Sequence, residues 1–362
     1  VGGDSKLSLA MLIGGDLTTY APAGSLSDPA VYRQVRALLA GLIREQGGVE
    51  VIACDLHPDY RSAILAAELL AWAPGARVMR IPHHFAHMAS GMYDHRLDTP
   101  VIGVAFDGTG YGTDGASWGG EILCGDRRAF TRAYHLEYLP MPGVDRVARD
   151  GWRMAAAYLC AAYGAPAVNA FPSWADRIGS ERVSAIQQMI DRSVQCPRSS
   201  SVGRLFDAVA SLTGICDRSA GEADAAIALE RAATEETGRI YPFDIHEDRI
   251  IVTGLIRAVV EDVRGGVDVG TVSAVFHETL AEIIVTAGMR LHAQRGLARV
   301  VLSGGCFLNK RLLRAVARRA EGTPLSVMSP QRYAPSDASL AVGQAVVAQA
   351  CIEEAVLSAG AR

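Results

Sequence analysis

Cysteine is sparse in this sequence and is never paired at close spacing. The 362 residues include 7 cysteines, an odd number, and no two of them form a Cys-x-x-Cys motif. This pattern argues against a disulfide framework and a structural zinc knot. A surplus of positive charge is missing as well, because the formal net charge is -4. Without a broad cationic field, nucleic acid is an unlikely partner, so we expect small molecules or another protein as partners. From the scattered cysteines we expect a reducing, cytoplasmic location.

Long apolar runs are also lacking. No uninterrupted stretch reaches the roughly 18 residues needed to cross a bilayer, and the amino terminus has no basic segment followed by an apolar core. We therefore expect no membrane partner. Apolar residues make up 49% of the chain and charged residues 20%, as in folded globular proteins. A chain of 362 residues exceeds the roughly 250 to 300 residues that one core usually serves, so we expect two lobes around a cleft.

What the sequence does contain is a series of apolar segments that alternate with helical patterns. Near-continuous apolar runs predict buried strands, and their alternation with helices predicts an α/β fold whose largely parallel sheets are covered on both faces. A helix is expected over residues 31–45, capped by Asp28 and Pro29, and a long amphipathic helix over 272–294. Residues 147–265 are rich in helical patterns and are interpreted as an insertion. The predicted strand segments are residues 7–15, 49–56, 76–81, 100–108 and 298–305.

The first chemical motif is a histidine pair in the sequence PHHFAHMAS. Pro82 suits a first helical turn, and His83 and His87 then lie four residues apart on one face. Imidazole nitrogens at this spacing can converge on one metal ion at about 2.0 to 2.2 Å. Surface helices also carry such pairs by chance. His84 stands where a His-Glu-x-x-His metalloprotease has glutamate, which argues against that class.

The second motif is VIGVAFDGTGYGTDG, an apolar strand that ends at Asp107 and opens a glycine-rich segment. An aspartate at a strand tip can hold a cation while glycine amides approach the phosphate that the cation neutralises. A tight hairpin is the alternative and is compatible with phosphate binding. The segment matches neither the Walker motif nor a convincing dinucleotide fingerprint.

Two further segments combine a turn with a helix start. Gly304 and Gly305 separate a strand from a helix that begins near Asn309, where a helix amino end can face a nucleotide. Alone, such a turn is more often purely structural. Asp337 opens an apolar helix, and the alternative there is a simple helix cap.

In their order along the chain, these segments resemble the carboxy-terminal, TsaD-like carbamoyltransferase domain of the HypF family of hydrogenase maturation factors. The resemblance implies a two-lobed actin/Hsp70/sugar-kinase (ASKHA) fold with duplicated ribonuclease-H-like lobes. The first lobe would comprise residues 1–98 and about 338–362, and the second residues 99–337 with a helical insertion at about 147–265. The matching segments are GGDSK, ACDLHPDY, HHFAH, FDGTGYGTDGASWGGE, WRMA, SSVGRLFDAVASLTG, FHETLAE, SGGCFLN and SDASLAVGQA.

The resemblance also implies site residues. The metal ligands would be His83, His87, Asp107 and Asp337, holding one divalent ion, with zinc or iron(II) suited to such ligands. Departures occur where the family has Tyr-Glu-Gly-Gln and Lys-Asn-Thr and this chain has residues 221–224 and 6–8. No catalytic proton-transfer residue is assigned. The implied contacts to ATP, AMP or carbamoyl-adenylate are Lys6, Gly108, Thr109, Gly110, Tyr111, Gly112, Gly203, Arg204, Asp207 (at a ribose hydroxyl), Glu222, Gly304, Gly305 and Asn309.

The activity that the resemblance implies is transfer of a carbamoyl group from carbamoyl-adenylate, made from carbamoyl phosphate and ATP, to the carboxy-terminal cysteine thiol of HypE. The thiocarbamate would serve cyanide-ligand synthesis for [NiFe]-hydrogenase. No acylphosphatase-like segment, Cys-x-x-Cys fingers or adenylate-forming domain is visible in the sequence. We therefore expect transfer alone, dependent on an adenylate-forming partner. The alternatives are a sugar-kinase-like phosphotransferase, TsaD-like tRNA threonylcarbamoyl transfer, and a catalytically silent nucleotide-binding scaffold.

Overall fold

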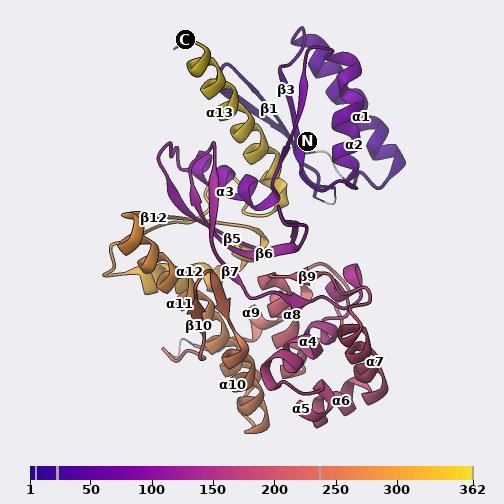
Figure 1. The fold of residues 1–362 in the computed structure, drawn as a ribbon, viewed down its shortest axis with the longest axis vertical. Coiled ribbons are helices and arrows are strands. Elements are labelled where there is room, and N and C mark those ends of the chain that lie inside the picture. Colours follow the sequence, from indigo (N-terminus) through magenta and orange to yellow (C-terminus); the bar gives the residue numbers. More distant parts are fainter. Residues whose placement is uncertain (5, 22–23, 236–237, 361–362) are drawn as a thin grey trace.

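The structure is a computed structural model that describes residues 1–4, 6–21, 24–235 and 238–360. Ser5 of the matching segment GGDSK and residues 361–362 of the predicted first lobe lie outside the described residues. Figure 1 shows three tiers along the long axis, with the first strands and the last helix at one end, a large sheet in the middle and a group of helices at the other end.

The amino-terminal tier contains two small, separate sheets. Strands β1 and β2 form an antiparallel hairpin. Strands β3 and β4 form a parallel pair and are connected by the helix that lies between them in the sequence. The first helix, α1, confirms the predicted cap, because the Asp28 side chain accepts a hydrogen bond from Ala30 N and Pro29 occupies the first turn. The elements are β1 (Leu9–Ile13), β2 (Asp16–Tyr20), α1 (Pro29–Glu45), β3 (Val51–Asp55), α2 (Arg61–Leu69), η1 (Leu70–Trp72) and β4 (Arg77–Ile81).

The middle tier is a nine-stranded sheet with the order β10-β11-β7-β6-β5-β12-β13, to which β8 and β9 are attached beside β6. The prediction of a largely parallel sheet is wrong here, because β5, β6 and β7 form an antiparallel meander. Their connections are too short for the crossover that parallel neighbours need. The strands are β5 (Val101–Tyr111), β6 (Ser117–Gly125), β7 (Phe130–Leu136), β8 (Leu139–Pro140), β9 (Arg198–Ser199), β10 (Asp244–His246), β11 (Arg249–Ile251), β12 (Arg299–Ser303) and β13 (Ser326–Met328).

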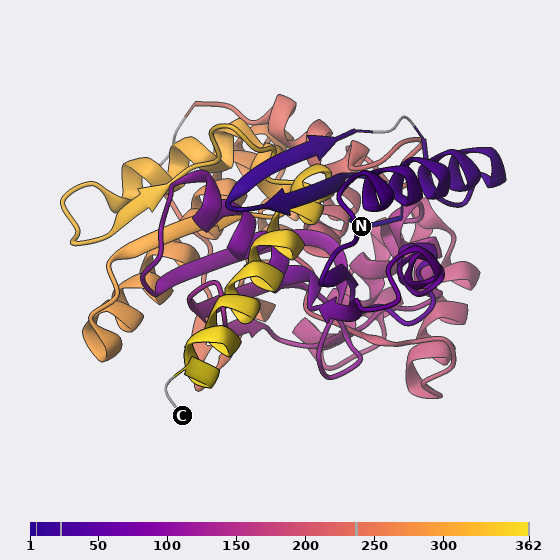
Figure 2. The same ribbon diagram turned by 90° about the horizontal axis from the view of Figure 1, so that it is seen from above.

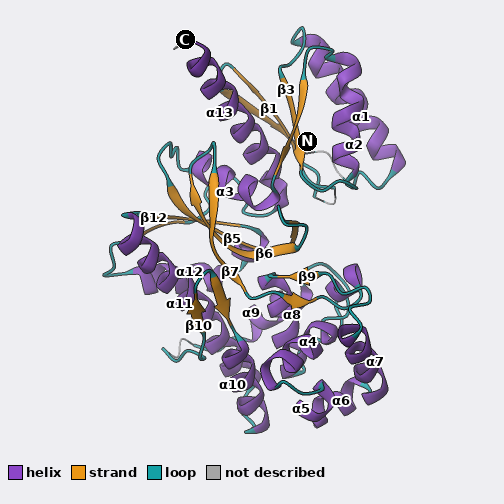
Figure 3. Ribbon diagram, in the orientation of Figure 1, coloured by secondary structure: helices purple, strands orange, loops and turns teal. Residues whose placement is uncertain are grey.

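The third tier is helical, as predicted for residues 147–265, but it is joined to the sheet (Figure 3). Strand β11 pairs with β7 and β9 pairs with β6, so the segment contributes strands as well as helices. The predicted lobe boundaries therefore stay a prediction. The elements are η2 (Val144–Ala148), α4 (Trp152–Tyr163), α5 (Ala167–Ala170), α6 (Pro172–Ile178), α7 (Ser180–Asp191), α8 (Val202–Thr213), α9 (Asp224–Ala232) and α10 (Thr253–Arg264).

The remaining helices connect the tiers. Helix α11, predicted over 272–294, is long and apolar enough to span a membrane by length and composition, as is the segment Asp337–Ser358. In α11, 83% of the apolar stretch that meets this criterion is buried inside the protein, as expected for a core helix. The elements are α3 (His83–Asp94), α11 (Val269–Arg295), η3 (Gly305–Leu308), α12 (Lys310–Ala320), η4 (Asp337–Ser339) and α13 (Leu340–Gly360).

Helices α3 and α13 are in direct backbone contact. A Cβ atom at Gly343 would lie 1.8 Å from the carbonyl oxygen of Ala86, so only glycine lets the two helices approach this closely. Figure 2 shows α13 running beneath the β1–β2 hairpin, which it also contacts. The first and last segments of the chain are thus fixed to the histidine-bearing helix.

Candidate metal and nucleotide site

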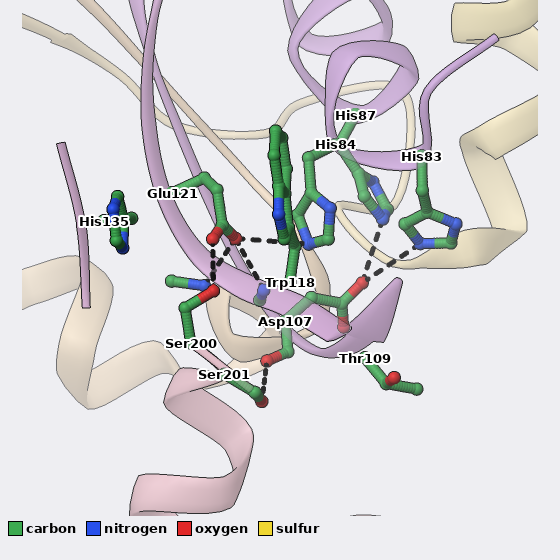
Figure 4. Close-up of polar contacts among 12 residues, drawn as sticks. His83, His84, His87, Asp107, Thr109, Trp118, Glu121, His135, Ser200 and Ser201 are labelled. Atoms are coloured by element: carbon green, nitrogen blue, oxygen red, sulfur yellow. Dashed lines mark hydrogen bonds and ion pairs between the residues drawn. The ribbon is translucent and has the colours of Figure 1, made fainter. Parts of the chain in front are cut away.

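Two histidines of α3 point into a cluster with two carboxylates from distant segments. The Nε2 atom of His87 lies 3.0 Å from Asp107 Oδ2 and 3.4 Å from Asp337 Oδ1, and His83 Nε2 lies 3.5 and 3.4 Å from the same two oxygens. One ligand atom from each residue falls within 4.8 Å of every other. The structure therefore brings together all four residues that the sequence singled out for a metal. Figure 4 shows three of them, His83, His87 and Asp107.

Asp107 is held in one orientation by backbone amides. Its Oδ1 accepts hydrogen bonds from Gly108 N at 2.7 Å and Gly305 N at 3.1 Å, which leaves Oδ2 facing the histidines. Gly304 makes this approach possible, because it adopts φ +95° and a Cβ atom there would lie 2.2 Å from Phe106 O. The Gly304–Gly305 turn thus acts on the cluster through Asp107.

His83 is oriented from behind by Asp55 at the end of β3. The Asp55 Oδ2 atom accepts a hydrogen bond from His83 Nδ1 at 2.8 Å, and both side chains are fully buried. When the imidazole is neutral, this contact selects the tautomer in which the lone pair of His83 Nε2 is directed into the cluster. The sequence reasoning did not assign a role to Asp55. The available signal was its position at the end of an apolar strand, immediately before the motif Leu-His-Pro.

The carboxylates of the cluster favour positive charge beside them. Burial opposes protonation of His83, but the carboxylates of Asp107, Asp337 and Asp55 outweigh it and raise the pKa of this histidine well above its usual range. Burial likewise opposes ionisation of Asp107, yet His83 and His87 hold the pKa of Asp107 well below its usual range. His83 Nε2 has no hydrogen-bond partner of acceptable geometry among the described atoms. A buried, unpaired nitrogen between two carboxylates is the arrangement that a metal ion completes.

The dimensions of the cluster fit one ion. Two ligands about 2.1 Å from a metal at a tetrahedral angle are about 3.4 Å apart. The nitrogen–oxygen separations between the histidines and carboxylates run from 3.0 to 3.5 Å. Two imidazoles and two carboxylates suit zinc or iron(II), and the metal itself stays a prediction.

The glycine-rich segment continues β5 rather than forming a loop. Gly110 and Tyr111 pair with β6 after a register shift, so the hairpin interpretation is correct. A Cβ atom at Gly110 would lie 2.6 Å from the rings of His83 and His84, so glycine is required where this strand crosses the histidine helix. Thr109 is exposed, and its Oγ1 lies 2.9 Å from Ser117 Oγ. Gly112 lies against the Trp118 ring.

The amino end of α8 abuts the same segment. A Cβ atom at Gly203 would lie 2.7 Å from Gly108 Cα, and the α8 cap residue Ser201 donates a hydrogen bond to the Gly108 carbonyl at 2.7 Å. A helix amino terminus is therefore directed at the strand where an anion was predicted. Arg204 forms an ion pair of 2.9 Å with Asp207. Burial nevertheless raises the pKa of Asp207 to about 6.

Two of the remaining predicted nucleotide contacts pair with each other. Lys6 Nζ lies 2.6 Å from Glu222 Oε1, which joins the amino-terminal segment to the loop before α9. Burial opposes the charge of Lys6, but Glu222, with Asp337 and Asp107, raises its pKa.

Asn309 is directed inward. Its Oδ1 caps α12 by accepting from Leu312 N, and its Nδ2 lies 2.8 Å from the buried His277 Nε2. Both polar ends of Asn309 are engaged inside the protein, and its contact with a nucleotide stays a prediction.

A second buried acid lies beside the cluster. Glu121 on β6 accepts hydrogen bonds from Arg132 at 2.7 Å, from Ser200 Oγ at 2.6 Å and from the Gly120 amide at 2.7 Å. The guanidinium of Arg132 in turn lies 3.9 Å from the centre of the Trp118 ring, a cation–π contact. Figure 4 shows Glu121, Ser200 and Trp118 next to Asp107 and the histidines.

Two family models match this chain. One, described as "HypF Kae1-like domain", matches residues 1–94. The other, described as "Carbamoyltransferase, Kae1-like Domain, second subdomain", matches residues 103–344, which is more than half of the chain. The chain belongs to the HypF carbamoyltransferase family. Its predicted class, a transferase, is thereby confirmed.

Relatives with similar sequences match this chain over nearly its whole length. A "Carbamoyltransferase HypF homolog" of Cupriavidus necator is 36% identical over 94% of this chain and 88% of its own length. "Carbamoyltransferase HypF" of Rhizobium leguminosarum bv. viciae is 34% identical over 97% of this chain, but the chain spans only 45% of that protein. A crystal structure of full-length HypF in the phosphate- and nucleotide-bound form matches with a TM-score of 0.89, 32% identity, and coverage of 97% and 55%. The predicted α/β actin-like fold class is confirmed.

Proposed function

We propose that this chain transfers the carbamoyl group of carbamoyl-adenylate to the carboxy-terminal cysteine thiol of HypE, for synthesis of the hydrogenase cyanide ligand. The observation that carries the proposal is the position of the His83–His87–Asp107–Asp337 cluster directly beside the Gly108–Gly112 strand, the α8 amino terminus and the Gly304–Gly305 turn. In a HypF-family chain, that arrangement provides a cation site next to an anion site. A nucleotide-bound relative of the same fold supports a nucleotide ligand here.

Each residue near the cluster has a distinct task. Asp55 and the α3 backbone hold His83 in place, while the Gly108 and Gly305 amides hold Asp107. The charged Lys6 lies where it can exchange Glu222 for a phosphate oxygen. A divalent cation bound at the cluster supplies Lewis acidity toward the phosphate or carbamoyl oxygen. The protein thus positions the substrate and neutralises its charge, which is how most of the catalytic effect would arise.

The proposed step is a substitution at the carbamoyl carbon. The cysteine thiol first gives its proton to solvent, and the thiolate sulfur attacks the carbonyl carbon. A carbon–sulfur bond forms while the bond from that carbon to the phosphate oxygen of AMP breaks. AMP leaves with the bonding electron pair. No electrons are gained or lost by an external agent, and the product is a protein thiocarbamate.

The decisive experiment mixes the purified chain with labelled carbamoyl phosphate, ATP and HypE, with and without an adenylate-forming partner. We expect label on HypE only when the partner, or carbamoyl-adenylate itself, is supplied. Transfer without either would show that the chain makes its own adenylate. No transfer with carbamoyl-adenylate, from protein that contains metal and binds AMP, would contradict the proposal and favour the silent scaffold.

The rival activities are separated in the same assay. Label on tRNA in place of HypE would favour the TsaD-like alternative, and phosphate transfer to a sugar would favour the kinase. A HypE variant lacking its terminal cysteine is the acceptor control. Its labelling at the intact level would exclude the thiol as the nucleophile.

A further inference from the structure

Helix α2 begins at a residue that is unusual for a helix cap. The cap residue is Tyr60, whereas caps are normally Ser, Thr, Asp or Asn, whose short side chains accept from the first amides. The Tyr60 side chain makes no such bond. The amides of Arg61 and Ser62 donate instead to the Asp4 carboxylate, at 2.8 and 3.0 Å. The helix is thus capped from another segment, and a local rule broken without gain to the helix points to a different role for the tyrosine.

The ring of Tyr60 is held in place by its own loop. It stacks on the His57 ring, with ring centres 4.2 Å apart and planes 7° from parallel. His57 is fixed in turn, because its amide donates to Asp55 Oδ1 at 2.8 Å and its Nδ1 accepts from Asp59 N at 3.1 Å. The Tyr111 ring of β5 meets the His57 ring at a steep angle, with centres 4.9 Å apart. The stacked rings therefore connect the β3–α2 loop to the end of β5.

The hydroxyl of Tyr60 lies beside the candidate metal cluster. The charges that act on it belong to His83, Asp55, Asp337 and Asp4. Asp55 also connects the loop to the cluster, since its Oδ1 accepts from His57 N and its Oδ2 from His83 Nδ1. No hydrogen bond joins Tyr60 Oη to another of the described residues. The loop thus brings an O–H group without a protein partner to the edge of the cluster.

Tyr60 keeps its proton in this environment. Burial raises the pKa of Tyr60 to about 12. His83 opposes this shift, whereas the carboxylates of Asp55 and Asp337 add to it. The hydroxyl is therefore a neutral hydrogen-bond donor at neutral pH. Such a donor, held in place before the reaction, contributes most where negative charge develops during the reaction.

In the proposed transfer, negative charge develops on the carbonyl oxygen of the carbamoyl group. The glycine segment and the helix terminus proposed for the phosphate belong to β5 and α8, whereas Tyr60 belongs to the β3–α2 loop of the amino-terminal tier (Figure 1). A substrate that contacts both sides has its phosphate at β5 and its carbamoyl group next to this loop. The carbonyl oxygen is then the acceptor that fits a neutral donor at this position.

We propose that the Tyr60 hydroxyl donates a hydrogen bond to the carbonyl oxygen of the carbamoyl group during its transfer, and that His57 is the positioning residue for the Tyr60 ring. This role rests on the proposed function. As the thiolate sulfur bonds to the carbon, the carbonyl π electrons move onto the oxygen, where the hydrogen bond becomes stronger. They return as the bond to the phosphate oxygen of AMP breaks, and AMP leaves with that bonding pair. Tyr60 keeps its proton throughout.

Tyr60→Phe removes the hydroxyl and leaves the stacked ring. We expect kcat for transfer from carbamoyl-adenylate to fall about 100-fold, as when one oxyanion donor is lost. KM, AMP affinity and metal content should stay within about twofold of the native values. Tyr163→Phe, on α4 in the helical tier, is the matched control and should retain full activity. A kcat within about threefold of native would overturn the proposal. So would a loss seen mainly in AMP affinity, since it would place the hydroxyl at the phosphate.

A measurement without turnover separates this role from the choice of acceptor. The probe is a carbamoyl-adenylate analogue with nitrogen in place of the bridging oxygen and ¹³C at the carbonyl, observed by infrared spectroscopy. Its carbonyl band should lie at lower frequency in the native protein than in Tyr60→Phe, because a hydrogen bond weakens the carbonyl bond. Equal frequencies would overturn the role of Tyr60 even if transfer to HypE occurs. A difference without transfer to HypE would support Tyr60 and contradict the proposed acceptor. Failure of the native chain to bind the analogue would contradict both.

The part played by His57 is tested by removing and then restoring its ring. His57→Ala takes away the stacking partner of Tyr60 and should lower kcat about tenfold, whereas His57→Phe should recover kcat to within about threefold of native. The carbonyl band of the bound analogue should move toward its Tyr60→Phe position in His57→Ala and return in His57→Phe. Equal losses in the two variants would show that the stacked ring does not position Tyr60 and would refute this role of His57.

Discussion

Two buried acid groups lie side by side in this protein and are neutralised in opposite ways. Glu121 holds Arg132, Ser200 and backbone amides, so its charge is met within the chain. Asp107 and Asp337 have no Arg or Lys partner of this kind among the described residues: one oxygen of Asp107 accepts from two backbone amides, and the other faces two imidazoles, each with an unpaired buried nitrogen. Both groups would cost several kcal/mol if left uncompensated. The difference supports the prediction that the His83–His87–Asp107–Asp337 cluster, unlike the Glu121 group, binds a cation from outside.

The largest effect is expected when a ligand of the His83–His87–Asp107–Asp337 cluster is removed. His87→Ala should eliminate bound metal, measured by elemental analysis, and lower carbamoyl transfer at least about a thousandfold, because Lewis-acid stabilisation is worth several kcal/mol. His246→Ala, at an exposed position of β10, is the matched control and should retain both. Full metal content in His87→Ala would show that His87 is not a metal ligand and that the two acid groups do not differ in this way.

Removing Arg132, which neutralises Glu121 from within the chain, should change the stability of the protein instead. Arg132→Met leaves the Glu121 carboxylate buried without its partner and should lower the free energy of unfolding by about 3 to 5 kcal/mol, measured by urea denaturation. The exposed Arg128→Met is the control. Adding Glu121→Gln to Arg132→Met should recover part of the loss. If the double variant were less stable than Arg132→Met, Glu121 would not be the group that Arg132 neutralises.

Asp207 is an intermediate case, because Arg204 compensates it only in part. Its pKa is about 6 in the folded protein and 3.8 in the reference state, so the folded state favours the protonated form. The resulting stability is fully present below about pH 4 and is lost as the pH rises through about 6, a change of about 3 kcal/mol. Unfolding of the native chain and Asp207→Asn should be compared at pH 4, 5, 6 and 7. Parallel stability profiles would show that burial does not raise this pKa.

Asp55 sharpens the comparison further, since it acts on the metal group only through His83. Asp55→Asn should weaken metal binding about 10- to 100-fold, measured by competition with a chelator, because the imidazole loses its orienting carboxylate. Asp16→Asn, at an exposed position, is the control. Unchanged affinity in Asp55→Asn would mean that packing alone orients His83.

The smallest effect is expected at the Lys6–Glu222 pair, whose side chains are 33% and 70% exposed. Glu222→Gln should change the free energy of unfolding by less than about 1 kcal/mol, and the difference should shrink as salt is added. A larger, salt-independent loss would show that this pair holds the fold together as firmly as Arg132 and Glu121.

The metal group could be predicted in part from local patterns. The spacing of His83 and His87 follows from the helix period, so the sequence alone places both on one face. Asp107 carries a weaker local signal, its place at a strand end before a glycine-rich segment, whereas the resemblance to a known family was needed to select Asp337 as a ligand. Asp55 was missed because its contact joins a strand end to a helix start across the fold.

Strand direction was the main failure at the level of the fold. Apolar runs predict that β5 and β12 are buried, but the same apolar pattern occurs in parallel and in antiparallel strands. The antiparallel meander was therefore interpreted as parallel.

The backbone contact between Gly343 and Ala86 has a consequence for the order of assembly. Asp337 begins the segment that this contact fixes to α3, and it leaves the ribosome long after His83 and His87. During synthesis, the emerging chain presents two histidines and Asp107 without their fourth companion. Metal capture by all four predicted ligands would therefore have to wait until the segment from Asp337 onward has been synthesised and has packed against α3.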